Sequence, residues 1–323
     1  MAYAKKTYEA ASAALARRKE RAETEAAARR DEAFARAPRL AEIERELRGT
    51  CFELVQCALS GGGSVDRVRE RNLALQAEQA ETLVTLGYPP DYLEPHYACP
   101  RCRDTGRVDG LPCACYEREL KKQAFLGTNL GGALQGQSFD NFDLRYYPED
   151  EVGGVSIRAR MEQNLNTCRA FAEDFDCARQ NLLLLGATGL GKTHLSSAIA
   201  QTVAESGHSV VYDTAGEIFQ RLDDRRFGRD TDGGAAADSY FSCELLIIDD
   251  LGSEMTTALT VAHLFSILND RMNRGRRMVI STNLTPEGIC KRYDEKISSR
   301  IIGEFLPLPF AGRDIRQQRR MQG

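Results

Sequence analysis

Residues 186–193 are GATGLGKT, and this stretch decides the fold of the 323-residue chain. It follows the apolar run 182–185, which is typical of a buried strand, and it precedes a helical pattern that begins at His194. A glycine-rich loop between a strand and a helix points successive backbone N–H groups at phosphate oxygens, and the helix dipole adds positive charge. Lys192 is expected to reach the β- and γ-phosphates, and the Thr193 hydroxyl to bind Mg²⁺. The stretch therefore predicts a site for a nucleoside triphosphate.

The predicted nucleotide-binding residues are this loop, the first helical residue and one downstream carboxylate. They are Gly186, Ala187, Thr188, Gly189, Leu190, Gly191, Lys192, Thr193, His194 and Asp249. The carboxylate follows the apolar run 245–248, which is typical of a buried parallel strand and ends in Asp249 and Asp250. Because ligands of open α/β sheets bind outside the carboxyl ends of the strands, we expect Asp249 to hold the Mg²⁺ shell. Asp250 is expected to orient the attacking water.

Three further residues are candidates for catalysis. Asn283 ends the strand pattern 278–282, and its amide either holds the water and senses the γ-phosphate, which we expect, or only caps the following turn. Arg300 is expected to be an arginine finger supplied between subunits, with Arg292 as a substitute. Arg316 is predicted to contact the γ-phosphate of its own chain. The alternative for each arginine is a solvated surface residue or a weak ion pair.

The order of apolar and polar segments predicts an α/β fold. Strands are expected at 182–185, 210–212, 245–248, 278–282 and 306–308, and helices at 157–175, 215–222 and 257–272. The segment between 222 and 245 is rich in Gly, Ala and Asp and is expected to be a loop. Strands that alternate with helices imply a parallel sheet covered by helices on both faces.

Ten cysteines in a chain without a secretion signal favour metal binding or reduced thiols over disulfides. Cys99 and Cys102 form CPRC, Cys113 and Cys115 form CAC, and a turn-rich loop separates the two pairs. Four thiolates on two such knuckles suit a tetrahedral, structural Zn²⁺. The second pair is one residue tighter than usual, so His96 is an alternative to one of its members. Reduced packing cysteines and a redox pair are the other interpretations.

The remaining chain divides into a helical N-terminal region and a linker. Residues 7–59 and 65–86 have helical apolar spacing, with a break at Pro38 and a joint at 61–63. This region is either an arm that docks on a partner, which we favour, or a solvated helix without one. The aromatic residues of 138–147 either line an adenine pocket or attach the linker to the α/β body, and we favour attachment. We expect a partner-binding region at 1–95, a zinc module at 96–126, a linker at 127–155 and the α/β domain at 156–323.

Net charge gives no argument for nucleic acid, because the chain carries only −4. Two local clusters are candidate contacts to single-stranded DNA. The first is Arg225, Arg226 and Arg229 with Phe227 for stacking, and the second is Arg271, Arg274, Arg276 and Arg277. Cations also favour a helix C-terminus, which is an alternative explanation of the second cluster. The apolar runs are strand-sized and the first eight residues lack a signal-peptide core, so we expect a cytoplasmic protein with no membrane contact.

Together these motifs resemble the AAA+ ATPases of the bacterial helicase-loader group, the DnaC and DnaI type. The resemblance covers about residues 99–316. It is carried by the phosphate loop, Asp249 with Asp250, both cysteine pairs and four short segments: SFDNFDL (138–144), STN (281–283), SSR (298–300) and GRDIR (312–316). The related transposition helper ATPases of the IstB type share the core but generally lack the cysteine module. Two features depart from the family: Asp250 stands where many members have Glu, and 15 residues after position 308 are too few for the usual helical lid.

The resemblance implies an AAA+ P-loop sheet with ATP, Mg²⁺ and Zn²⁺ as cofactors. It implies an ATPase that loads the hexameric replicative DNA helicase onto single-stranded DNA, grips the helicase through the N-terminal region and self-assembles through the ATPase domain. The competing interpretations are a transposition helper and a nucleotide-gated adaptor that scarcely hydrolyses ATP.

Overall fold

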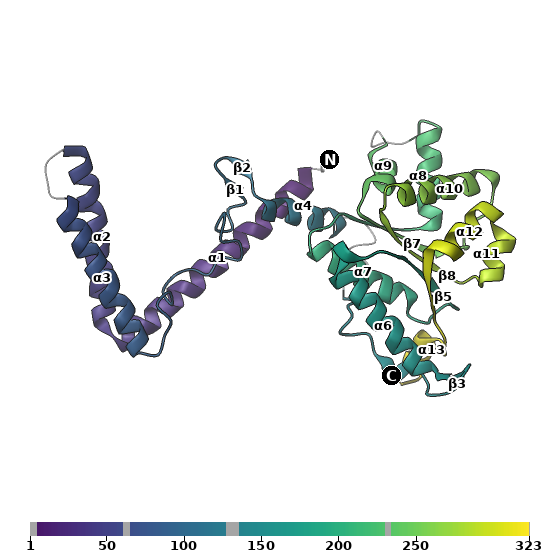
Figure 1. The fold of residues 1–323 in the computed structure, drawn as a ribbon, viewed down its shortest axis with the longest axis horizontal. Helices are drawn as coiled ribbons and strands as arrows, with labels where there is room; N and C mark the ends of the chain where they lie inside the picture. Colours follow the sequence, from purple (N-terminus) through teal and green to yellow (C-terminus); the bar gives the residue numbers. More distant parts are fainter. Residues whose placement is uncertain (1–4, 61–64, 127–135, 230–233, 323) are drawn as a thin grey trace. The chain divides into compact units, whose positions relative to one another are not determined.

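The computed structural model describes residues 5–60, 65–126, 136–229 and 234–322 (Figure 1). The chain divides into two compact units, one of residues 12–116 and the other of residues 1–11 with 117–323. Within the described ranges, no helix has both the length and the apolar character that crossing a membrane requires.

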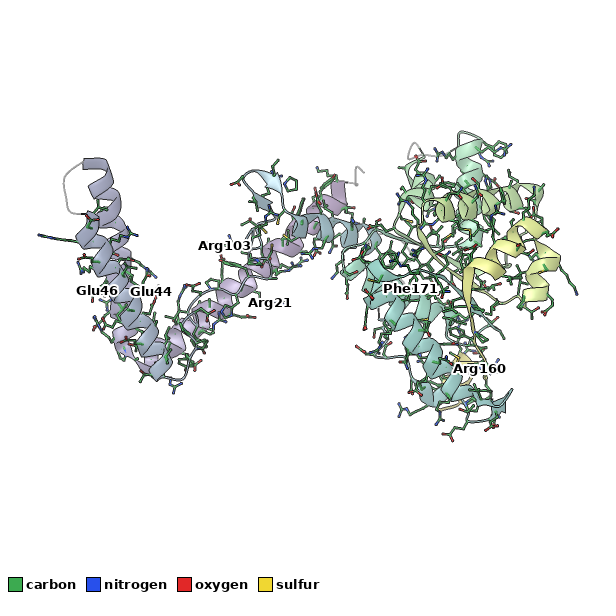
Figure 2. The ribbon with its side chains drawn as sticks, viewed as in Figure 1. Arg21, Glu44, Glu46, Arg103, Arg160 and Phe171 are labelled. Atoms are coloured by element: carbon green, nitrogen blue, oxygen red, sulfur yellow. The ribbon has the colours of Figure 1, made fainter. Side chains whose placement is uncertain are left out.

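The unit of residues 12–116 is mostly helical. Its long helices are α1 (Lys5–Arg36), which begins before the unit boundary, α2 (Pro38–Ser60) and α3 (Val65–Thr85). Pro38 is the first residue of α2, where its missing N–H is harmless, so the predicted break falls there. The predicted joint at 61–63 lies outside the described residues. Leu40 and Leu83 are fully buried where these helices meet, and Glu46 belongs to the charged surface of α2 (Figure 2).

A short hairpin separates the two cysteine pairs. β1 (Arg107–Val108) pairs antiparallel with β2 (Leu111–Pro112). The two turn residues, Asp109 and Gly110, have φ of 51° and 81°, as the tight turn of a two-residue hairpin requires. Helix α4 (Ala114–Leu126) begins directly after Cys113.

The other unit is built on a parallel sheet of five strands in the order β6-β7-β8-β5-β9. The strands are β5 (Asn181–Leu185), β6 (Val210–Thr214), β7 (Leu245–Leu251), β8 (Arg277–Thr282) and β9 (Phe305–Pro309). A separate hairpin joins β3 (Glu151–Val152) to β4 (Val155–Ser156).

Helices cover both faces of this sheet (Figure 1). Leu182 and Leu184 face the core that contains α6 (Ile157–Glu173) and α7 (Lys192–Glu205). Leu183 and Leu185 face the opposite core, to which α8 (Ala215–Arg226), α9 (Ala235–Ser242), α10 (Ala258–Asn273), α11 (Pro286–Arg292) and α12 (Glu295–Glu304) contribute. Burial on two faces explains why the strands are continuous apolar runs. The predicted α/β class is confirmed.

One local prediction is wrong. The segment between 222 and 245 was expected to be a loop, but α8 extends to Arg226 and residues 235–242 form α9. Gly234 caps α9 with φ of 82°, and the three alanines after it have the highest helix propensity of any residue. Tyr240 is fully buried in the core, so packing adds to propensity in fixing this helix.

Candidate nucleotide-binding site

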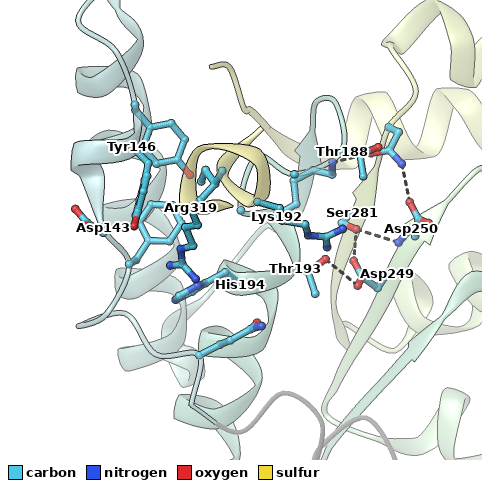
Figure 3. A pocket seen from close by; sticks show the side chains of 18 of the residues that line it. Asp143, Tyr146, Thr188, Lys192, Thr193, His194, Asp249, Asp250, Ser281 and Arg319 are labelled. Carbon is cyan, nitrogen blue, oxygen red and sulfur yellow. Dashed lines mark hydrogen bonds between the residues drawn. The ribbon is translucent and has the colours of Figure 1, made fainter. Parts of the chain in front are cut away.

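A pocket of about 430 Å³ lies where the carboxyl ends of the strands meet the phosphate loop, the linker and the last helix, α13 (Ile315–Gln322) (Figure 3). A volume of this size is typical of small-molecule sites. The pocket brings together these predicted site residues: Thr188, Gly189, Gly191, Lys192, Thr193, His194, Asp249, Asp250, Asn283 and Arg316. Three residues of the same loop are not among the described residues that line the pocket. They are Gly186, Ala187 and Leu190.

All three glycines of the phosphate loop occupy crowded positions, and two of them, Gly189 and Gly191, line the pocket. Gly189 has φ of 79°, and a Cβ placed there would lie 2.3 Å from the Asp314 carboxylate. Gly191 has φ of 89°, and its Cβ would lie 2.7 Å from the Tyr147 hydroxyl. Any larger residue would be strained in backbone conformation and would also collide with its neighbours. Gly191 caps α7, so the helix begins at Lys192, two residues before the predicted start.

The Lys192 ammonium is held at the centre of the loop. Its Nζ donates to the carbonyl oxygens of Gly186 at 2.6 Å and Ala187 at 2.8 Å, and to Asn283 Oδ1 at 2.7 Å. Burial lowers the pKa of Lys192, while the nearby charges of Asp249 and Asp250 oppose that shift. A partly buried cation among carbonyl groups is well suited to receive phosphate oxygens.

Asp249 is oriented by three hydroxyl groups. Thr193 Oγ1 donates to its Oδ2 at 3.2 Å, Tyr212 OH donates to the same oxygen at 2.9 Å, and Ser281 Oγ donates to Oδ1. The neighbouring hydroxyl of Thr193 and carboxylate of Asp249 are hard oxygen donors of the kind that Mg²⁺ prefers. Tyr212 and Ser281 were not predicted as site residues. They lie toward the carboxyl ends of β6 and β8, on either side of β7, and this position in the strands is the signal that could have found them.

Asp250 has a distorted backbone. Its φ is 57°, and the pairing of β7 with β8 shifts register between Ile248 and Leu251. Such a bulge redirects the side chain away from the alternation of a regular strand. Asn283 Nδ2 donates to Asp250 Oδ1 at 2.7 Å, and Ser281 Oγ accepts from the Asp250 backbone N–H at 3.0 Å. Asn283 therefore bridges Lys192 and Asp250, one through its oxygen and one through its nitrogen.

The linker aromatic residues both attach the linker and line the pocket. Phe142 and Tyr147 are buried in the core of the α/β unit, and Tyr147 OH donates to the Leu190 carbonyl oxygen at 2.8 Å. Both also line the pocket, together with Tyr146. His194 packs edge-on to Phe142, with ring centroids 5.2 Å apart. The two interpretations of this segment are therefore compatible.

Helix α13 forms one wall of the pocket. The Ile315 backbone N–H donates to the Gly189 carbonyl oxygen at 3.0 Å, which ties the C-terminal segment to the phosphate loop. Arg316 and Arg319 both line the pocket, and the Arg319 guanidinium lies 5.2 Å from the centroid of the Tyr146 ring. Arg319 was not predicted from the sequence, where it is one of several arginines in the last ten residues.

Arg300 and Arg292 lie outside the described lining of the pocket. Arg300 Nη1 donates to the Lys296 carbonyl oxygen at 3.0 Å, and its guanidinium lies 4.9 Å from the centroid of the Phe265 ring. Arg292 donates to the Glu254 carbonyl oxygen. An arginine finger acts on a nucleotide bound to another subunit, and the structure contains one chain. The finger role of Arg300, with Arg292 as its substitute, therefore stays a prediction.

The four predicted metal-binding cysteines converge within the unit of residues 12–116. The sulfur atoms of Cys99, Cys102, Cys113 and Cys115 all lie within 4.8 Å of one another. Four sulfurs at a Zn–S distance of about 2.3 Å fit this arrangement, so the donor set suits zinc. Buried Asp104 accepts hydrogen bonds from the backbone N–H groups of Ala98 at 2.8 Å and Cys99 at 3.0 Å, which holds the first knuckle in place. His96 is not in the cluster; its Nε2 lies 3.7 Å from Asp91 Oδ2.

Three of the four arginines of the second basic cluster have structural roles, whereas Arg274 is exposed and lies 3.0 Å from Asp270. Arg271 is fully buried and donates to the carbonyl oxygens of Tyr240, Cys243, Glu244 and Arg277 at 2.7–3.2 Å. Arg276 and Arg277 also donate to carbonyl oxygens, at 3.1 and 2.7 Å. The prediction that Arg271 contacts nucleic acid is therefore wrong, because its guanidinium is buried and donates to backbone carbonyl oxygens inside the fold.

The first basic cluster is exposed. Phe227 is 60% exposed, and the Arg229 guanidinium lies 5.2 Å from the centroid of its ring. Arg225 pairs with Asp238, and Arg229 lies 3.2 Å from Asp224. An exposed aromatic ring beside arginines keeps this surface a candidate for stacking on single-stranded nucleic acid.

Comparison with known proteins shows similarity to one family and to several relatives. Residues 150–302 match the family described as "IstB-like ATP binding protein", so this part of the chain is similar to that family. The chain is 26% identical over 219 residues to the phage-like element PBSX protein XkdC of Bacillus subtilis (strain 168), with 64% of this chain and 78% of the relative covered. It is 23% identical over 219 residues to the replicative helicase loader DnaC of Buchnera aphidicola subsp. Acyrthosiphon pisum (strain APS), with 67% and 84% covered.

Two further similarities are to a replication initiator protein and to a solved structure. The chain is 28% identical over 182 residues to the chromosomal replication initiator protein DnaA of Wolinella succinogenes, but it spans only 40% of that protein's length, while 56% of this chain is covered. A crystal structure of the DnaC helicase loader is 21% identical, with a TM-score of 0.45, and the match covers 54% of this chain and 98% of that one. The chain is thus similar to proteins of the DnaC and IstB type, in agreement with the resemblance of its sequence motifs.

Proposed function

We propose that this chain, through the domain that is similar to the IstB-like family, is an ATPase that loads the hexameric replicative DNA helicase onto single-stranded DNA. One observation carries the enzymatic part: Asn283 connects the lysine of the phosphate loop to Asp250 across one pocket. Loop lysine, strand-end carboxylates and a polar amide are the parts that phosphoryl transfer to water requires.

The proposed roles follow from the positions of the side chains. Lys192 binds the β- and γ-phosphates, and Thr193 with Asp249 would hold Mg²⁺, which would supply positive charge beside the phosphate oxygens. Asp250 accepts a proton from the attacking water and Asn283 orients that water. Arg316 contacts the γ-phosphate from α13, and Arg300 reaches the same group in a neighbouring subunit of the assembly. The backbone of loop residues 186–191 curves around the phosphates, and Thr188, Gly189, Gly191 and His194 line the pocket that would hold the nucleotide.

The partner is proposed from the relatives. The Buchnera relative is named a replicative helicase loader, and it is matched over 84% of its length. In this chain the helical region 1–95 would grip the helicase, the module 96–126 would be stabilised by Zn²⁺ at its four cysteines, and 127–155 would link it to the ATPase domain 156–323. Exposed residues such as Phe227 are proposed to contact the DNA strand.

A transposition helper ATPase is the second candidate, because the matching family is described as IstB-like. The four-cysteine cluster argues for the loader, since helpers of that type generally lack the module. A neighbouring transposase gene would favour the helper.

The test is a loading assay with the full chain. The host replicative helicase and circular single-stranded DNA are incubated with this protein, with and without ATP, and helicase retained on DNA after a salt wash is measured. We expect retention to depend on this protein and on ATP, to be lost with Lys192→Ala and to be unchanged with Lys291→Ala, a control on the exposed surface of α11. Absence of any complex with helicase at micromolar concentration would remove the loader assignment. The ATPase assignment would be tested separately, by measuring ATP hydrolysis.

A further inference from the structure

A tight turn follows Asp250 and holds its backbone. The Asp250 carbonyl oxygen accepts two hydrogen bonds from Ser253, one from the hydroxyl at 2.8 Å and one from the backbone N–H at 3.2 Å. On its other side, the Asp250 backbone N–H donates to Ser281 Oγ at 3.0 Å. A left-handed φ of 57° is uncommon outside glycine, and these bonds select it. The turn of residues 250–254 therefore helps to place the Asp250 carboxylate.

Glu254 closes this turn with its side chain. Its Oε2 accepts from the Gly252 backbone N–H at 2.7 Å, two residues after Asp250. Gly252 has φ of 98°, and a Cβ there would lie 2.6 Å from the Leu284 side chain. The turn is thus packed tightly against the segment that follows Asn283, and Glu254 fixes the backbone of the turn at that point.

The same carboxylate connects the turn to α11. Tyr293, the residue after this helix, donates its hydroxyl to Glu254 Oε1, and Arg292 donates to the Glu254 carbonyl oxygen. Tyr293 is buried, and burial raises the pKa of its hydroxyl, which therefore stays protonated as a donor. One oxygen of the Glu254 carboxylate is used within the turn, and the other is used for α11.

Helix α11 also begins beside the partner of Asp250. Thr285 caps the first turn of the helix, two residues after Asn283, whose amide donates to Asp250 Oδ1 at 2.7 Å. One end of α11 therefore follows Asn283 in the chain, and the other end reaches the turn of Asp250 through Glu254.

We propose that Glu254 is a positioning residue: it fixes Asp250 relative to Asn283 through α11, so that the position of this helix controls turnover. Neither Glu254 nor Tyr293 belongs to the described lining of the pocket, so both act on the reaction through Asp250. The inference rests on the proposed ATPase site and adds to it a control of the proposed general base.

Turnover at saturating MgATP and ATP affinity by titration calorimetry, both measured on the full chain, test the assignment. Glu254→Ala removes both carboxylate bonds and should lower turnover by about 10- to 100-fold, because a misplacement of about 1 Å can cost about 10²-fold in rate. ATP affinity should stay within about threefold, since the phosphate loop is unchanged. In Glu254→Gln the amide oxygen can accept from Gly252 and the amide nitrogen can donate to the Tyr293 hydroxyl oxygen, so turnover should return to within about threefold of wild type.

Tyr293→Phe removes only the bond between Glu254 and α11. It should lower turnover by about three- to tenfold, the effect of one hydrogen bond. The matched control is Tyr240→Phe, because Tyr240 is also buried and donates to one carboxylate, that of Asp213, outside the described lining of the pocket. Both tyrosine variants should unfold at lower urea, but Tyr240→Phe should keep turnover within about twofold of wild type.

Turnover of Glu254→Ala within about twofold of wild type would overturn the positioning role while ATP hydrolysis stands, and so would equal losses of turnover in the two tyrosine variants. Turnover of Glu254→Gln as low as that of Glu254→Ala would also overturn it, because the charge rather than the two bonds would then matter. If Glu254→Ala does not fold, the comparison of Tyr293→Phe with Tyr240→Phe decides. A wild type that binds ATP without hydrolysing it would overturn the ATPase assignment itself, and the positioning role with it.

Discussion

The Asn283 side-chain oxygen accepts a hydrogen bond from Lys192 Nζ at 2.7 Å, which joins the end of β8 to the phosphate loop. The two residues are 91 positions apart in the chain. A phosphate that replaced the loop carbonyl groups as partner of the ammonium would therefore act on a bond made by the end of β8.

Lys192→Ala is expected to abolish ATP binding. The change removes the only ammonium in the described lining of the pocket, and charge-assisted hydrogen bonds of about 1.5–3 kcal/mol each would be lost. We expect the affinity for MgATP to fall by about 100-fold or more in titration calorimetry. Lys291→Ala should bind as wild type does, and retained affinity in Lys192→Ala would contradict the phosphate-binding role.

Asp250→Asn is expected to separate binding from hydrolysis. Asn tolerates the left-handed backbone at this position as well as Asp does, so the variant removes the charge and preserves the bulge. ATP affinity should stay within about threefold, and turnover should fall by about 10²–10⁴, the usual contribution of a positioned general base. Turnover and loading equal to those of wild type would instead favour the nucleotide-gated adaptor.

Tyr212→Phe is expected to raise the Mg²⁺ concentration needed for ATP turnover. The variant removes the hydroxyl that donates to Asp249 Oδ2 at 2.9 Å, and loss of such a bond should also lower the free energy of unfolding by about 2 kcal/mol. The control is Tyr240→Phe, which removes the comparable bond to Asp213 Oδ2 at 2.8 Å outside the pocket. Both variants should unfold at lower urea, but only Tyr212→Phe should shift the Mg²⁺ dependence. Equal Mg²⁺ dependence in the two would refute a positioning role for Tyr212.

Arg300→Ala is expected to leave ATP binding unchanged and to remove turnover that depends on assembly. Arginine fingers contribute about 10³–10⁵ in rate, so the rise of specific activity with protein concentration should disappear. Arg300→Lys should not restore it, because an ammonium lacks the planar fork of the guanidinium. If instead the variant's specific activity climbs with concentration as wild type's does, Arg300 serves only to hold α12 near Phe265.

Cys102→Ser is expected to release zinc. Elemental analysis of wild type should find about one zinc ion per chain, since four thiolates complete a structural site. The variant should lose the metal and expose the unit of residues 12–116 to proteolysis, because binding of a structural metal contributes to folding. Cys290→Ser, at an exposed cysteine of α11, is the control and should keep the metal. A metal-free wild type would refute the prediction.

The fold was largely predictable from local patterns. The apolar runs 182–185 and 245–248 became β5 and β7, and the glycine-rich loop between β5 and α7 lies where a phosphate loop must. Helix α9 was not predicted, because glycine and aspartate around residues 228–234 are typical of a loop, and the helix after them is stabilised by burial of Tyr240.

The site was predictable only where a motif carries the chemistry. Lys192 and Asp249 come from local patterns, whereas Tyr212 acts on Asp249 from a neighbouring strand 37 residues earlier in the chain. Glu254 and Arg319 belong to the turn after β7 and to the last helix, and no periodicity distinguishes them from other polar residues. Their importance depends on three-dimensional proximity, which the sequence specifies only through the complete fold.

The left-handed backbone of residue 250 limits which acids natural variation can place there. Aspartate adopts this conformation with little penalty, whereas the longer glutamate would be strained by about 1–2 kcal/mol. An ancestor that exchanged one acid for the other would therefore need a compensating change in how β7 pairs with β8. If the chain hydrolyses ATP as proposed, the identity of the acid beside the attacking water is thus restricted by the backbone geometry of one strand end.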